Sequence, residues 1–60
     1  MHNGKIDKFR FEMDDSTNRI MIYEEGQGVE PVAFISVNRS ISKKEFDIEI
    51  MDWYCKSVKY

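Results

Sequence analysis

The stretch Ile41-Ser42-Lys43-Lys44-Glu45-Phe46-Asp47 decides the fold, because it marks the start of a helix. The Ser42 hydroxyl can accept a hydrogen bond from the Glu45 amide, while the Glu45 carboxylate can accept one from the Ser42 amide. This reciprocal pair is a capping box, and Ile41 and Phe46 occupy the flanking positions of a hydrophobic staple. Two start signals at one place predict a helix over residues 43–59.

Three segments before this helix have the residue pattern of β-strands. Residues 5–13 alternate, with Phe9, Phe11 and Met13 on one side and charged residues on the other. Residues 19–23 and 32–37 are apolar on both sides. Their two sides are Ile20 and Ile22 against Met21 and Tyr23, and Val32 and Phe34 against Ala33, Ile35 and Val37.

The connections between these segments are short and rich in turn-forming residues: Asp14-Asp15-Ser16-Thr17-Asn18 and Glu24-Glu25-Gly26-Gln27-Gly28. Short connections join antiparallel strands, because parallel pairing needs a long crossover. The sequence therefore predicts an α+β fold, βββα: a three-stranded antiparallel β-meander in the order 1-2-3, followed by one C-terminal α-helix packed on the sheet. We expect a single small domain over residues 1–60, with a loose N-terminus at 1–4 and the sheet at 5–37.

Size and composition restrict how such a chain is stabilised. A 60-residue domain buries only about 60% of the surface that its unfolded chain exposes. Cys55 is the one cysteine and His2 the one histidine, so the chain offers neither an intrachain disulfide nor a Cys/His metal set. Self-association remains as a source of additional stability. We expect no metal and no cofactor.

The charge is nearly balanced, with 9 basic and 11 acidic residues and a net charge of −2. A module dedicated to duplex nucleic acid carries a basic excess, which this chain lacks. The sequence shows neither a transmembrane span nor the apolar run of a signal peptide, and its single thiol suits a reducing compartment. We therefore expect a cytoplasmic protein without membrane contact.

Two loop segments resemble ligand-binding motifs only in part. Counting from Asp14, a calcium loop needs glycine at the sixth position, where this chain has Arg19, so the segment is interpreted as a turn. Gly26-Gln27-Gly28 lacks the third glycine and the following helix start of a phosphate loop, and acidic residues surround it. A hairpin loop is the better interpretation.

The helix carries residue types that catalysis uses, but without the partners that catalysis needs. No histidine lies within helical reach of Cys55 to activate the thiol, so we predict a small buried hydrophobic residue there. Glu45, Glu49 and Asp52 share one helix face and are expected to be solvated, with Lys56 pairing with Asp52. These observations argue against an enzyme.

The aromatic residues leave two interpretations open. Most of them are expected to form the core of a small domain. Alternatively, aromatic side chains on the sheet surface could bind single-stranded nucleic acid, with positive charge from Lys8, Arg10, Arg19 and Arg39.

The predicted helix has more apolar surface than one sheet can cover. Placed at 100° per residue, Phe46, Ile50, Trp53 and Tyr54 form one flank, and Ile48, Met51, Cys55 and Val58 form a second. We therefore predict a homodimer and a small non-catalytic protein-interaction module, a regulator or inhibitor of an unidentified protein partner. Candidate interface residues are Met21, Tyr23, Ile35, Ile48, Met51, Cys55 and Val58. The alternative is a nucleic-acid-binding domain that uses the sheet surface.

Overall fold

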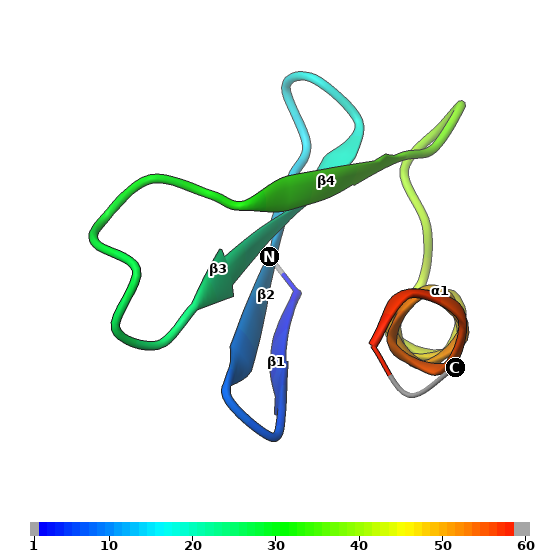
Figure 1. Ribbon diagram of the computed structural model, residues 1–60. Helices are drawn as coiled ribbons and strands as arrows, with labels where there is room; N and C mark the ends of the chain where they lie inside the picture. The colour runs from blue at the N-terminus through cyan, green and yellow to red at the C-terminus, as the bar shows by residue number, and fades with distance from the viewer. Residues whose placement is uncertain (1, 59–60) are drawn as a thin grey trace.

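A four-stranded antiparallel sheet with one helix against its inner face makes up the fold (Figure 1). The computed structural model describes residues 2–58. Along the sheet the strands follow their order in the chain, β1-β2-β3-β4. The elements are β1 (Asn3–Ile6), β2 (Phe9–Asp14), β3 (Arg19–Glu24), β4 (Ala33–Ser36) and α1 (Lys43–Ser57). This confirms the α+β meander with a C-terminal helix, but with four strands instead of three.

The additional strand comes from the segment predicted as one strand over residues 5–13. The chain reverses at Asp7, whose φ of 56° lies in the left-handed region, so that β1 and β2 form a hairpin. The prediction of a loose terminus at residues 1–4 was therefore wrong for Asn3 and Gly4, which pair with β2, while residue 1 lies outside the described residues. His2 is also held, since one of its ring nitrogens lies 2.9 Å from the Ile41 carbonyl oxygen.

The remaining strands match their predicted faces. Phe11 pairs with Ile22 and Met13 with Ile20, which places these side chains on one side of the sheet. β4 is shorter than the predicted 32–37 by one residue at each end, since both Val32 and Val37 lie outside the strand. Val32 is 46% exposed. The β3 partners Ile20 and Ile22 orient Ile35 and Ala33 toward the inner face. The opposite, outer face of the sheet carries Phe34.

The helix begins where the sequence predicts. The Glu45 amide donates to Ser42 Oγ at 3.2 Å, and the Ser42 amide donates to Glu45 Oε1 at 3.2 Å, completing the capping box. Ile41, the staple residue, packs against the buried cluster that contains Phe46. α1 ends at Ser57 with Val58 as its C-cap, and the predicted last residue, Lys59, lies outside the described residues.

The core lies between α1 and the inner face of the sheet. The helix contributes Phe46 and Ile50, and the half-buried Trp53 makes edge-to-face contacts with Phe9 and Phe11 at centroid distances of 5.3 and 5.7 Å. Gly4 of β1 allows the helix to approach, because a Cβ there would lie 3.2 Å from Ile50 Cδ1. The fully buried or nearly buried residues are Phe9, Phe11, Met13, Ile20, Ile22, Phe46 and Ile50.

Candidate interaction surface

The side of α1 that points away from the sheet is apolar. We call this surface the outer helix face; it consists of Ile48, Met51, Cys55 and Val58, the second flank of the sequence analysis. Ile48 is 58% exposed and Met51 is 52% exposed, whereas Phe46 and Ile50 on the sheet side are buried. The helix therefore covers the sheet with one flank only.

Cys55 corrects one prediction. The thiol is exposed and not buried, because the outer helix face has no second layer of protein above it within residues 2–58. In the sequence its apolar neighbours Met51 and Val58 suggested burial, but these neighbours are exposed themselves. The side chain belongs to an open apolar surface.

Charged residues surround the outer helix face. A shallow depression along it is lined by Lys44 and Asp47 in the N-terminal half of the helix and by Asp52 in the C-terminal half, together with Ile48, Met51 and Cys55. Asp47 is engaged by Lys43 at 2.6 Å and Asp52 by Lys56 at 3.3 Å, the latter pair as predicted. An apolar strip with a charged rim is the usual composition of a protein-binding surface.

The structure separates the other candidate interface residues from this face. Met21 and Tyr23 of β3 lie half-buried on the outer face of the sheet, on the side opposite α1. Ile35 lies on the inner face and packs against the core cluster. The predicted interface residues therefore lie in three separate places: the outer helix face, the outer face of the sheet and the core. They do not form one continuous interface.

The outer face of the sheet holds two arginine–aromatic pairs. The Arg10 guanidinium carbon lies 4.7 Å from the centroid of the Tyr23 ring, and the Arg19 guanidinium carbon lies 4.7 Å from that of Phe34. Cross-strand pairing of Arg10 with Tyr23 creates the first pair. Phe34 is 52% exposed and was not among the predicted site residues, although its place in an alternating strand was a signal for it.

Two of the predicted nucleic-acid contacts lie elsewhere. Lys8 sits in the β1–β2 turn, where its ammonium is 3.0 Å from the Glu24 carboxylate, and the hydrogen bond with Glu24 raises the pKa of Lys8. Arg39 lies in the connection between β4 and α1 and pairs with Glu45 at 2.7 Å. Of the four basic residues, Arg10 and Arg19 therefore share the outer face of the sheet, where they lie near opposite ends of the β2–β3 pair.

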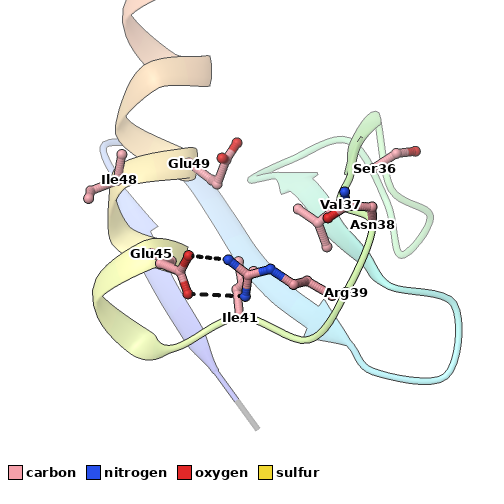
Figure 2. Close-up of a pocket in the computed structure, with 8 residues that line it drawn as sticks. All are labelled: Ser36, Val37, Asn38, Arg39, Ile41, Glu45, Ile48 and Glu49. Carbon is pink, nitrogen blue, oxygen red and sulfur yellow. Dashed lines mark hydrogen bonds and ion pairs between the residues drawn. The ribbon is translucent and has the colours of Figure 1, made fainter.

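The Arg39–Glu45 ion pair spans one end of a groove between β4 and α1. Figure 2 shows Glu45, Ile48 and Glu49 on the helix side and the segment from Ser36 to Asn38 on the strand side. The two terminal nitrogens of the Arg39 guanidinium, Nη1 and Nη2, donate to the Glu45 carboxylate at 3.5 and 2.7 Å. The hydrogen bond from Arg39, helped by the Ser42 amide, lowers the pKa of Glu45.

This groove corrects the prediction that Glu45, Glu49 and Asp52 share one solvated helix face. Glu45 and Glu49 are half-buried on the lateral side of α1 that faces β4, whereas Asp52 is exposed. The side of α1 opposite the sheet belongs to the outer helix face, where Ile48 and Met51 are exposed. The Arg39–Glu45 ion pair links the β4–α1 connection to the first turn of the helix.

The two loop segments are structural turns. The Ser16 amide and hydroxyl both donate to Asp14 Oδ1, at 3.1 and 2.7 Å, and these bonds lower the pKa of Asp14. Gly26 and Gly28 both have a φ of 87°, which a hairpin loop accommodates with glycine. Both observations agree with the turn interpretation of these segments.

Among residues 2–58, no group of three or more His, Cys, Asp and Glu side chains is placed to hold a metal ion. The part of the chain that the structure describes contains no helix long and apolar enough to cross a membrane. Comparison with protein-family models, curated proteins and solved structures yields no match.

Proposed function

We propose that this chain is a non-catalytic protein-interaction module that associates through the outer helix face. The observation that carries the proposal is the exposure of Ile48 and Met51, each more than half exposed, side by side on a helix whose other flank is already packed. Apolar side chains gathered on one surface mark binding sites, because a monomer gains nothing by exposing them together.

The charged groups of the helix support an interaction role over a catalytic one. Asp47 and Asp52 are held in ion pairs with lysines one helical turn away, and Glu45 is held by Arg39. A catalytic acid or base needs an environment that brings its pKa toward the working pH, whereas the pKa of Glu45 is lowered by its partner. In this proposal the chain forms a homodimer through the outer helix face, and the dimer acts as a regulator or inhibitor of a second protein.

The test is self-association of single-site variants. Sedimentation equilibrium over micromolar to millimolar concentrations should show the wild type passing from 7.2 kDa toward twice that mass. Ile48→Lys should abolish this association. Phe34→Lys is the matched control, because Phe34 is similarly exposed but lies on the outer face of the sheet. A wild-type protein that stays at 7.2 kDa, or a Phe34→Lys protein that alone loses association, would contradict the proposal.

A second candidate function is binding of single-stranded nucleic acid on the outer face of the sheet. The Arg10–Tyr23 and Arg19–Phe34 pairs favour it, since exposed rings accompanied by arginine provide stacking surfaces for bases. Against it, Arg10 also pairs with Glu12 at 3.1 Å, and the net charge is negative.

Electrophoretic mobility shift at low salt tests this second candidate with an oligothymidylate of about ten nucleotides. Binding that Phe34→Ala and Arg10→Gln remove would support it. Arg39→Gln serves as the control, because this substitution also removes one positive charge, but from the β4–α1 connection and not from the sheet surface. Equal loss of binding in all three variants, or no shift of the wild type, would contradict it.

A further inference from the structure

We infer that an extended basic segment of another protein pairs with the free edge of β4 as an additional strand, with a lysine or arginine side chain beside Glu49. The inference goes beyond the proposed function, because it concerns a different surface and does not depend on the outer helix face. It starts from the position of β4 at the end of the sheet, where no further strand lies beside it within residues 2–58.

The register of β3 and β4 determines which backbone groups of β4 point away from the sheet. The Val37 amide donates to the Asn18 carbonyl at 2.9 Å, so Ile35, the alternate residue, also directs its backbone N–H and C=O toward β3. The N–H and C=O groups of Phe34 and Ser36 therefore point toward the free edge. An antiparallel strand presents donors and acceptors at the same spacing, so it is the partner that these groups match.

The two edges of the sheet differ in how they are protected. On the β1 edge, Lys5 supplies a charge, and Lys43 Nζ lies 3.3 Å from the Asn3 carbonyl oxygen. The other edge strand, Ala33–Ser36, contains neither a charged residue nor a proline. Such residues prevent an edge strand from pairing with another chain. β4 is therefore the edge that is open to a partner strand.

The groove between β4 and α1 receives side chains of the added strand. Residues opposite each other on neighbouring strands lie on the same face, so partner residues opposite Ile35 and Val37 point toward the inner face. Val37 lines the groove on the strand side, and Ile48 and Glu49 line it on the helix side (Figure 2). The groove thus accepts an apolar and a charged side chain from the partner.

Glu49 determines the sign of that charge. Its side chain is half-buried, and no ion pair with it is found among residues 2–58, whereas Arg39 neutralises Glu45 in the same groove at 2.7 Å. A lysine or arginine opposite Val37 supplies the missing cation. The β4 edge of a second copy does not, because Ala33–Ser36 contains no basic residue. We therefore assign the edge to a different chain.

A synthetic peptide tests the strand addition. The acetylated and amidated hexapeptide Thr-Lys-Thr-Val-Thr-Val, aligned antiparallel with its lysine opposite Val37, should bind the intact protein with a dissociation constant on the order of 100 μM. Nuclear magnetic resonance should show slower hydrogen exchange of the Phe34 and Ser36 amides in the complex. N-methylation of the threonine opposite Ser36 should abolish binding, because it removes a donor to β4. N-methylation of the valine opposite Ile35 is the matched control, since that N–H points away from β4.

A charge swap tests the role of Glu49. Replacing the peptide lysine by glutamate should weaken binding to the wild type roughly fivefold, because an attraction becomes a repulsion. Glu49→Lys should reverse this preference. Asp47→Lys is the matched control, because it makes the same change of charge on the helix but outside the groove, and it should keep the preference for the lysine peptide. Circular dichroism checks that both variants are folded.

The possible outcomes distinguish this inference from the proposed function. Unchanged Phe34 and Ser36 amides at millimolar peptide, equal binding of the two N-methylated peptides, or a lysine preference that survives Glu49→Lys would overturn it. Protection of the two amides that rises with protein concentration in the absence of peptide would assign the edge to a second copy and would also overturn it. Ile48→Lys should bind the peptide within about threefold of the wild type, whether or not the outer helix face mediates self-association.

Discussion

Gly4→Val is the perturbation that tests the packing of β1 most sharply. Gly4 lies on the inner face of β1, where an added Cβ would meet Ile50 Cδ1 at 3.2 Å and Phe46 Cε2 at 3.5 Å. A branched side chain is larger than this space and must displace the helix or the strand. Overpacking of a core costs about 1–3 kcal/mol. In a domain of this size, ~2 kcal/mol lowers the melting temperature by on the order of 10 °C.

Lys5→Val is the matched control, because the same residue is introduced one position further along β1 on the opposite face. Lys5 is exposed, and its substitution should change the free energy of unfolding by no more than about 0.5 kcal/mol. Thermal unfolding followed by circular dichroism compares the two variants directly.

A double-mutant cycle identifies the contact. Ile50→Val removes the Cδ1 atom that an added Cβ at residue 4 would meet, and alone it should cost about 1 kcal/mol. In the Gly4→Val background this cost should be smaller, with a coupling energy of at least ~0.5 kcal/mol. An unchanged melting temperature for Gly4→Val, or additive effects of the two substitutions, would refute the packing of β1 beneath α1.

Three further predictions concern the helix. Ser42→Ala removes the acceptor of the Glu45 amide and should cost about 1 kcal/mol, seen as a melting temperature several degrees lower; an unchanged midpoint would contradict the capping box. Because Arg39 lowers the pKa of Glu45 below its usual 4.5, the pair stabilises the fold above that pH, and this contribution is lost as the pH falls through the lower folded-state pKa. Arg39→Gln should therefore reduce the fall in melting temperature between about pH 5 and about pH 3, and equal falls in both proteins would contradict this. Ellman's reagent should react with Cys55 rapidly in dilute native protein and more slowly as the concentration rises, because association covers the outer helix face; slow reaction at every concentration would show a thiol buried within one chain.

The parts of the fold that depend on neighbouring residues were predictable from the sequence. The capping box and staple around Ser42 lie within six residues, and the structure places the helix start where they indicate. The two flanks of α1 also follow from helical geometry alone, which separates Phe46 and Ile50 from Ile48 and Met51. Helical geometry does not predict whether the Cys55 side chain is exposed, since its exposure depends on whether another part of the protein covers that flank.

The first hairpin was missed for a physical reason. Its turn is formed by Asp7 and Lys8, without the Gly or Asn-Gly signal that marks most two-residue hairpins, and Asp7 adopts its positive φ without being glycine. The alternation through Phe9, Phe11 and Met13 therefore predicts a single strand that extends back to Lys5. Gly4 was the overlooked signal, since a glycine within a strand marks the close approach of another element.

The surface features were predictable only where strand register determines them. Asp14 and Arg19 flank a turn, so their pairing places Arg10 opposite Tyr23, and this contact follows from the hairpin. Arg39 and Glu45 meet because the β4–α1 connection returns to the helix start, a path that no local pattern indicates. The position of this ion pair had to come from the structure.

An isotope-filtered nuclear Overhauser experiment on a mixture of labelled and unlabelled protein tests the central claim most directly, because it records only contacts between copies. We predict intermolecular contacts from the Ile48 and Met51 methyl groups of one copy to the outer helix face of the other. Intermolecular contacts confined to Met21, Tyr23 and Phe34 on the sheet, or none at millimolar concentration, would contradict the claim that the outer helix face is the interaction surface.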